Sequence, residues 1–497
     1  MTVPSKDEVE NYPSTPRREL LASGDSRAVE NARKVYDWAV EVDEKKHHPT
    51  TTFLQTTAIG RAPGRVEILG NHTDYNDGFV LSAGVQMQCR VVMGVMERTH
   101  EADNSVSTSS SPPCELSVYS ASFPELGIAT CTFSDVFSQP FENLGLPGYC
   151  KYICGVFVEF FRKINRSENN NLVETAKLLS KKIAKIQVYV ESDVPLGAAV
   201  SSSAALEVST AVVLEKLFAS AGESRSIDLF EKSKKISSAP ALTALEVILL
   251  CKKAENDYVG MGCGILDQFS SHQAAQDTLL LLDCRYPMEN LKKIKPSDGG
   301  FVFVIANTGV KHALVDGQYD KLKRLCYEGR DSLKKAIEEE NKQNTTTSIL
   351  HLRDVSSAQF EKFKEKIPTK EARDRAQHAV YENERVLEAA KLFEEDAEVE
   401  SRSKSELDHA SSPSKRRKRG EVDGSPSTKS VSVSDKINKP LPTTTTSAEE
   451  LRLKRFGQLM HESHKSSQFL FQNSCAELDK MVELALTCPG CLGARLM

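Results

Sequence analysis

The apolar residues of this chain fall into two kinds of pattern. Short runs rich in β-branched residues predict strands around four valines, namely Val66, Val80, Val91 and Val188. Apolar residues with the spacing of an amphipathic helix follow Ser202 and cover Leu242–Tyr258. Because strands and helices both recur along the chain, the pattern predicts a fold that contains both.

The pattern also divides the chain into parts. Residues 1–28 are polar and predict a disordered tail, whereas residues 29–297 contain the predicted strands and form a first expected domain. Residues 298–497 predict a second, mostly helical domain that opens with a buried strand at Val302–Ala306. Residues 397–448 contain no aromatic residue and many Ser, Thr, Lys and Glu, so we expect a disordered insertion in this second domain.

Composition excludes several function classes. The net charge of −5 over 497 residues gives no nucleic-acid signature, and no apolar run reaches membrane-spanning length. The N-terminus is polar and lacks an apolar signal region, so we expect a cytoplasmic protein. The basic run Lys415–Arg419 is typical of a nuclear-import tag, an anion-binding patch or a charged surface loop. The 12 cysteines show no disulfide rhythm, and we expect reduced thiols even at the close pair Cys488 and Cys491.

Candidate chemistry begins around the strand predicted at Val66. Arg65 precedes this strand, and Asn71, His72 and Asp74 follow its end. Hydrogen-bonding side chains in such number suit a small polyhydroxylated ligand, whose hydroxyls need paired donors and acceptors. The alternative is a polar turn between two strands.

A loop of small residues opens the helix predicted after Ser202. Its backbone N–H groups and the helix dipole make such a loop a candidate anion site, and serine hydroxyls can bind phosphate or a metal ion. The alternative is an ordinary helix N-cap. The candidate residues are Pro195, Gly197, Ala198, Ala199, Ser201, Ser202 and Ser203.

A third stretch, residues 254–270, contains acidic residues in an apolar setting. Asp267 is flanked by Ile265, Leu266 and Phe269. A partly desolvated carboxylate near a cation is a plausible proton acceptor, although Asp-Gln after a glycine turn is also a common helix cap.

These three motifs, in this order, resemble the signatures of the galactokinases within the GHMP family of small-molecule kinases. The resemblance covers residues from about 55 to 497, with insertions. It implies an α+β, two-domain GHMP-kinase-like fold with the active site in the cleft between the domains. It also implies transfer of the ATP γ-phosphoryl to the anomeric hydroxyl of a galactose-type sugar, with ATP and Mg²⁺ as cofactors. The expected partners are the small-molecule sugar and ATP, without nucleic acid or membrane, and the sequence does not decide the oligomeric state.

The resemblance also implies roles for individual residues. The catalytic residues would be Arg65 and Asp267, which stabilise charge and accept the hydroxyl proton. Sugar would be bound by Asn71, His72, Asp74, Gly264 and Tyr319. ATP would be bound by the small-residue loop and by Tyr149 against the adenine. Mg²⁺ would be held by Glu255 and Ser202.

The chain departs from the family pattern in four places. Glu67 stands where the family usually has Asn, and Asn71 stands where it usually has a Glu that bonds a sugar hydroxyl, taken as that on C6. We therefore expect relaxed specificity at C6. Ala199 replaces a glycine, which strains the loop if this position needs positive φ. The family's third glycine-rich signature does not follow Met497, so we expect a gene model cut short before it and an inactive or poorly folded product. The alternatives are a non-catalytic regulator that binds galactose and ATP, and a galacturonate kinase.

Overall fold

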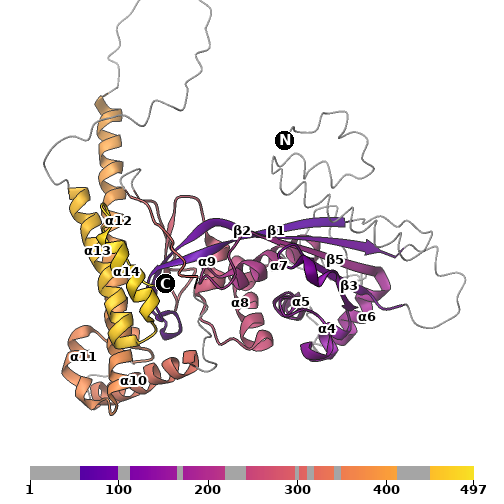
Figure 1. The fold of residues 1–497 in the computed structure, drawn as a ribbon, viewed down its shortest axis with the longest axis horizontal. Helices are drawn as coiled ribbons and strands as arrows, with labels where there is room; N and C mark the ends of the chain where they lie inside the picture. Colours follow the sequence, from indigo (N-terminus) through magenta and orange to yellow (C-terminus); the bar gives the residue numbers. More distant parts are fainter. Residues whose placement is uncertain are drawn as a thin grey trace, which may run out of the picture.

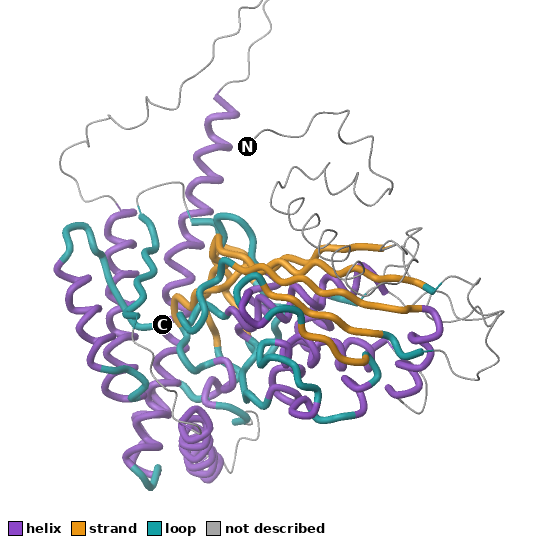
Figure 2. The backbone as a smooth tube through the Cα atoms, turned by 45° about the vertical axis from the view of Figure 1, so that its right-hand side comes forward, coloured by secondary structure: helices purple, strands orange, loops and turns teal. Residues whose placement is uncertain are grey.

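The computed structural model of this protein describes residues 56–98, 112–164, 172–218, 242–296, 301–309, 318–340, 349–410 and 448–497. Among them, one part of the molecule is a sheet with helices against one face, and the other part is a group of helices (Figure 1). Figure 2 shows the strands as one continuous layer beside the helical group. The molecule is thus an α+β protein of two parts, as the resemblance implies.

Seven strands form the sheet: β1 (Thr56–Leu69), β2 (Phe79–Glu97), β3 (Glu115–Ser120), β4 (Ala129–Thr132), β5 (Ile183–Ser192), β6 (Leu279–Asp283) and β7 (Lys292–Ile294). Their order is β4-β3-β5-β2-β6-β7, with β1 paired to β2 off this path. β3 and β5 are parallel, and the other paired strands of the described sheet are antiparallel. The strands predicted around the four valines are confirmed.

The long strand β2 connects the two halves of the sheet. Its first residues, Phe79–Ala83, pair with β6, whereas Cys89–Glu97 pair with β5. β1 runs antiparallel to β2 beside them, so residues 70–78, which connect the two strands, lie at one end of the sheet. This end faces α12 and α13 of the helical part (Figure 1).

The helices of the first part are α4 (Asp135–Ser138), α5 (Cys150–Ile164), α6 (Leu172–Lys182), α7 (Ser202–Phe218), α8 (Ala244–Lys253) and α9 (Leu266–Gln273). α7 is apolar almost all round and packs against β1 and β2. A Cβ atom at Gly60 of β1 would lie 1.8 Å from the Ser209 carbonyl oxygen of α7, so only glycine permits this close approach. α8 begins with a capping box between Thr243 and Glu246.

The helices of the second part are α10 (Gln318–Glu340), α11 (Ser357–Phe363), α12 (Lys370–Ala410), α13 (Ala448–Lys465) and α14 (Ala476–Thr487). Shorter 3₁₀ helices are η1 (Asp74–Asn76), η3 (Pro124–Leu126), η4 (Phe141–Asn143), η6 (Leu352–Asp354) and η7 (Lys364–Lys366), and η5 (Ala254–Val259) and η9 (Ser466–Phe471) are π-helices. A core of buried residues that includes Leu322, Phe360 and Phe471 joins α10, α11, α12 and η9. None of the described helices is long and apolar enough to cross a membrane.

The buried strand predicted at Val302–Ala306 is wrong. The segment has no strand conformation, and Val302 and Val304 are 83% and 84% exposed. Phe303 instead packs on Phe456, while Phe301 packs on Phe393. Within the described residues this segment has no strand beside it, and an apolar run without a hydrogen-bonded neighbour does not form a buried strand.

The predicted insertion at 397–448 is wrong in its first residues. α12 continues to Ala410, because good helix formers such as Ala, Glu and Lys follow its core-facing turns. Residues 411–447, with the basic run Lys415–Arg419, and the predicted tail 1–28 lie outside the described residues.

Candidate active site

A tight loop at the end of β1 carries the residues predicted to bind sugar. It opens at Gly70 with φ +110° and passes through His72 with φ +59°. The Thr73 hydroxyl donates to the Gly70 carbonyl oxygen at 2.7 Å and lies 2.8 Å from the Phe79 carbonyl oxygen, which ties the two ends of the loop together. The closure of the loop therefore comes from its own hydrogen bonds.

The predicted catalytic residues form an ion pair. Arg65 on β1 donates from Nε and Nη2 to Oδ1 of Asp267, at 2.9 and 2.6 Å, in the first turn of α9. The two side chains are 12% and 26% exposed. Burial opposes the charge of Arg65, but the carboxylates of Asp267, Glu67 and Asp74 together outweigh it and raise the guanidinium pKa. The structure brings together two residues that are 202 positions apart in the sequence.

The predicted phosphate loop touches this pair directly. Arg65 Nη1 donates to the Ala199 carbonyl oxygen at 2.7 Å, and the Arg65 backbone N–H donates to the Val200 carbonyl oxygen at 3.1 Å. The Ser201 hydroxyl donates to Oδ2 of Asp267 at 2.6 Å. A Cβ atom at Gly64 would lie 2.6 Å from the Val200 carbonyl oxygen, so glycine permits the loop to lie on the strand.

The backbone of this loop is suited to an anion. Gly197, Ala199 and Ser201 all have positive φ, at 68°, 56° and 53°, and α7 begins at Ser202. Residues in this conformation alternating with ordinary ones turn successive N–H groups toward one concave side, next to the positive end of the helix. Pro195, Gly197 and Ala199 are exposed. The residues present therefore fit a nucleotide phosphate.

A buried acidic cluster lies beside the phosphate loop. Gln268 donates to Oε2 of Glu255 and, at 3.0 Å, to Oε2 of Glu207, and the Cys263 thiol lies 3.4 Å from Glu255. Burial and Asp267 raise the pKa of Glu255, while a hydrogen bond from Ser203 is among the groups that lower it. Oε1 of Glu207 is buried without a hydrogen-bond partner in the described structure.

This cluster fits Mg²⁺ held jointly with a nucleotide. The described residues contain no group of three or more His, Cys, Asp or Glu arranged around one metal. Mg²⁺ usually takes only one or two carboxylates and completes its shell with phosphate oxygens and water. The serine hydroxyl beside Glu255 is that of Ser203, whereas the sequence-based assignment named Ser202.

The remaining predicted sugar residues gather around the loop after β1. Gly264 lies so close to Asp74 that a Cβ atom there would be 1.7 Å from Oδ2. The ring of His72 stacks on Phe471 with centroids 4.4 Å apart and lies 5.6 Å from the ring of Tyr319. Burial, Asp267 and Glu67 raise the pKa of Asp74 to about 7.

Comparisons with known proteins agree with this arrangement. The family model of the galactokinase galactose-binding signature matches residues 50–95, and that of the GHMP kinase N-terminal domain matches residues 170–273. The galactokinase of Clostridium acetobutylicum is 26% identical over 91% of this chain and 83% of its own length. That of Bacillus subtilis is 25% identical over 88% of this chain and 80% of its own length. The chain is related to the galactokinases.

A solved galactokinase shows the same fold. The crystal structure of the Lactococcus lactis enzyme in complex with galactose superimposes with a TM-score of 0.60, at 22% identity, over 92% of this chain and 87% of that one. The galactokinase signature begins before β1 and includes β1, the loop after it and most of β2. The GHMP domain includes the phosphate loop and α9.

The galactokinase signature does not include the residues that support its own loop. Glu382 on α12 accepts from the Gly70 backbone N–H at 3.0 Å, and the ring of His378 bonds the Asn71 carbonyl oxygen at 2.9 Å. Arg495 bonds Glu67 at 2.8 Å and the Ile68 carbonyl oxygen at 3.0 Å. Sequence reasoning missed these residues, because they lie more than 300 positions from the loop, and no local pattern marks them.

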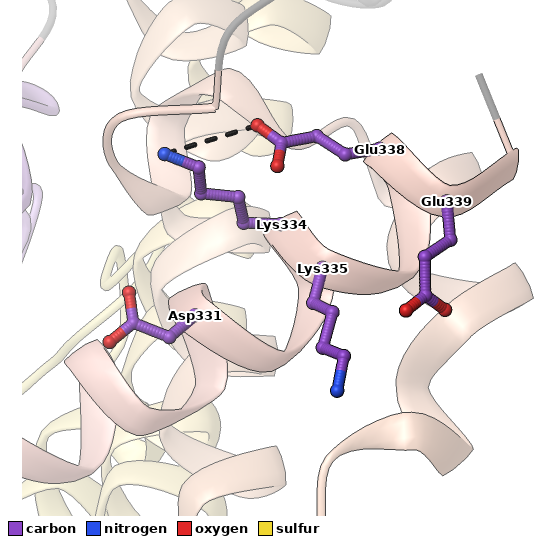
Figure 3. A pocket seen from close by; sticks show the side chains of 5 residues that line it. All are labelled: Asp331, Lys334, Lys335, Glu338 and Glu339. Carbon is purple, nitrogen blue, oxygen red and sulfur yellow. Dashed lines mark ion pairs between the residues drawn. The ribbon is translucent and has the colours of Figure 1, made fainter. Parts of the chain in front are cut away.

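Two further features complete the description. Tyr149, predicted beside the adenine, stacks on Phe123 with ring centroids 5.4 Å apart, and it packs against the same hydrophobic core as Ala198 of the phosphate loop. The surface pocket in Figure 3 is lined only by charged side chains of α10, and it shares no residue with the candidate site. These are Asp331, Lys334, Lys335, Glu338 and Glu339.

Proposed function

We propose that this chain is an ATP-dependent sugar kinase of the galactokinase type. It transfers the γ-phosphoryl group of ATP to the anomeric hydroxyl of galactose or a close analogue and yields the sugar 1-phosphate. The observation that carries this proposal is the Arg65–Asp267 ion pair. The guanidinium of Arg65 bonds both Asp267 and the carbonyl oxygen of Ala199, and it therefore connects the pair to the phosphate loop. We place the reaction in the cytoplasm, with no nucleic acid or membrane partner.

Asp267 and Arg65 have separate roles in this proposal. Asp267 accepts or orients the proton of the attacking hydroxyl, whose oxygen forms the new P–O bond while the bond to the leaving ADP breaks. Arg65 stabilises negative charge on the attacking oxygen and holds the Asp267 carboxylate in place through two hydrogen bonds. Enzymes catalyse phosphoryl transfer almost entirely by such positioning and charge stabilisation. Mg²⁺, when bound by Glu255 and a neighbouring serine hydroxyl, would neutralise charge on the phosphates.

The charges around the sugar loop favour a neutral sugar over an acidic one. Burial, together with the negative charges of Asp267 and Glu67, raises the pKa of Asp74 to about 7. A sugar carboxylate would add another negative charge to this group. The galacturonate alternative is therefore weaker than galactose.

A non-catalytic regulator is the second candidate function. A protein that only binds sugar and ATP does not need a carboxylate held by both an arginine and a serine beside the phosphate loop. Of the two candidates, this geometry favours the enzyme.

Phosphate transfer with purified protein tests the proposal. We expect ADP release from ATP and Mg²⁺ that depends on galactose, and a sugar 1-phosphate product identified by ³¹P NMR; this outcome would overturn the sequence-based expectation of an inactive or poorly folded product. A parallel titration of galactose binding separates the two candidates. Binding of galactose without any transfer would support the regulator, and transfer to a hydroxyl other than the anomeric one would contradict the proposed reaction.

A further inference from the structure

Both oxygens of the Asp267 carboxylate accept hydrogen bonds from other side chains of the protein. Oδ1 accepts two hydrogen bonds from Arg65, at 2.9 and 2.6 Å. Oδ2 accepts one from the Ser201 hydroxyl, at 2.6 Å. A sugar hydroxyl that is to give its proton to this carboxylate therefore has to take the place of one of these donors.

Ser201 is the donor that can leave. Arg65 is held at four points, because its guanidinium bonds Asp267 twice and the Ala199 carbonyl oxygen once, and its backbone N–H bonds the Val200 carbonyl oxygen. The Ser201 hydroxyl makes a single hydrogen bond and can turn about one rotatable bond. The backbone of the loop, which Arg65 holds at Ala199 and Val200, does not have to move.

Ser201 also belongs to the loop that fits a phosphate. It lies immediately before the first residue of α7, with φ +53°, where the turned-out N–H groups and the helix dipole favour an anion. A hydroxyl released from Asp267 at this position can donate its hydrogen to a phosphate oxygen.

We propose that Ser201 is a positioning residue that couples the two substrates, an inference that rests on the proposed kinase function. Without ligands its hydroxyl fixes Oδ2 of Asp267. When the sugar arrives, the sugar hydroxyl takes this place on Asp267, and the freed Ser201 hydroxyl turns to the nucleotide phosphate. Each substrate therefore makes the site better for the other, and by linkage the two effects are equal.

Calorimetric titrations of wild type and S201A test this coupling. The Mg²⁺ complex of a non-hydrolysable ATP analogue is titrated with and without saturating galactose. In wild type we expect galactose to tighten analogue binding by about tenfold. In S201A we expect this factor to fall to about one, and galactose binding without nucleotide to become tighter, because no hydroxyl has to be displaced.

Two further variants make the test specific. S201G removes the same hydroxyl and suits the positive φ, so it should behave as S201A does even if alanine strains the loop. S209A removes a buried hydroxyl of α7 that bonds the Cys89 and Ala205 carbonyl oxygens, and it should keep the tenfold factor. If Ser201 had a purely structural role, its substitution would weaken the binding of both ligands and leave the coupling factor unchanged.

The possible failures can be told apart. If wild type binds and phosphorylates galactose but shows no coupling, or if S201A and S201G keep it, the inference is overturned while the kinase remains. If wild type neither binds nor phosphorylates any sugar, the proposed function fails.

Discussion

The two sides of the candidate site are built in different ways. On the catalytic side, Arg65, Ser201 and Asp267 all come from the sheet part and hold one another. On the sugar side, the loop after β1 is held by side chains of α12, such as Glu382 and Asn383, from the helical part. Chemistry is therefore placed within one part of the molecule, whereas the shape of the sugar site depends on how the two parts pack.

The two sides also differ in burial: the catalytic side chains are partly exposed, whereas those behind the sugar loop are buried. Asp267 is 26% exposed and can reach a ligand. The side chains of Glu382 and Arg495 are 0% and 2% exposed and serve the protein interior. A substitution on the catalytic side should therefore change turnover more than folding, and one behind the sugar loop should change folding first.

The largest expected effect is on the catalytic side. D267A should lower kcat by about 10²–10⁴-fold, because it removes the group that accepts the hydroxyl proton. ATP affinity should not fall, because Asp267 is assigned to the sugar hydroxyl; on the coupling proposed above, release of Ser201 from Asp267 should tighten ATP binding. Steady-state kinetics with galactose, together with ATP binding, check this. A wild-type kcat in D267A would remove Asp267 from the mechanism.

The second prediction concerns the buried charges behind the sugar loop. E382A should reduce the free energy of unfolding by about 3–5 kcal/mol, because it leaves Arg385 without its carboxylate in the interior. Denaturant titration measures this loss. E388A on the same helix is the matched control, because its pair with Arg455 is exposed and should contribute about 0–1 kcal/mol. Equal losses in both variants would contradict the distinction between the two sides.

The third prediction is a loss of stability in acid that comes from the sugar side. Burial lowers the pKa of His378 from 6.5 to about 4 and that of His72 to about 3. The unfolded chain then binds more protons than the folded one below pH 6.5. Stability should fall from pH 6.5 down to those values, by up to about 1.4 kcal/mol per pH unit for each histidine.

Denaturant midpoints between pH 7.5 and 4.5 check this slope. H378Q removes one titrating group and should make the slope shallower, whatever it does to stability at pH 7. Glu382, whose pKa is lowered to about 2 because Arg385, His378 and Arg495 outweigh its burial, should add a further loss only as pH falls from 4.5 toward 2. A midpoint that is constant from pH 6.5 to 4.5 would contradict the assignment of neutral, buried histidines.

The difference between the two sides also explains what the sequence could predict. Arg65, Ser201 and Asp267 each lie in a short motif, so sequence reasoning found all three and the structure brings them together. Arg495 and Glu382 lie in stretches without such a pattern, and only the packing of α12 and the last residues against β1 gives them a place in the site.

The strand that was predicted wrongly also shows the importance of residues far away in the sequence, because a strand forms only where another strand pairs with it. The strands around Val80 and Val188 have hydrogen-bonded neighbours in the sheet. Val302–Ala306 has the same apolar composition and no such neighbour among the described residues. Propensity alone cannot distinguish these cases, because a strand is stabilised by the strand beside it.

The fourth prediction concerns the exchanged pair Glu67 and Asn71. Asn71 donates to Glu67 at 3.2 Å and accepts from Asn473 at 2.6 Å. Part of the hydrogen-bonding capacity of its amide is therefore taken up by the protein and is not available to a ligand. N71E should destabilise the protein by about 1–2 kcal/mol, because two carboxylates then meet in the interior. E67N/N71E should recover most of this loss.

The sugar specificity of these variants tests the same pair. If Asn71 relaxes recognition at C6, wild type should discriminate galactose from 6-deoxygalactose about tenfold less than E67N/N71E does, measured as kcat/KM. The difference reflects a neutral hydrogen bond in place of one to a charged group. Equal discrimination in the two proteins would show that position 71 does not read C6.

The smallest expected effect is at Ala199 on the phosphate loop. Its φ of +56° lies in the left-handed region, so the strain foreseen for an alanine at this position is present. A left-handed backbone conformation destabilises a residue with a Cβ atom by about 1–2 kcal/mol. Glycine avoids this strain, but its greater conformational freedom in the unfolded chain offsets about 0.5–1 kcal/mol of the gain. A199G should therefore stabilise the protein by about 0.5–1 kcal/mol or tighten ATP binding severalfold. Thermal unfolding with and without ATP measures both, and a lower melting temperature in both conditions would show that Ala199 is not strained.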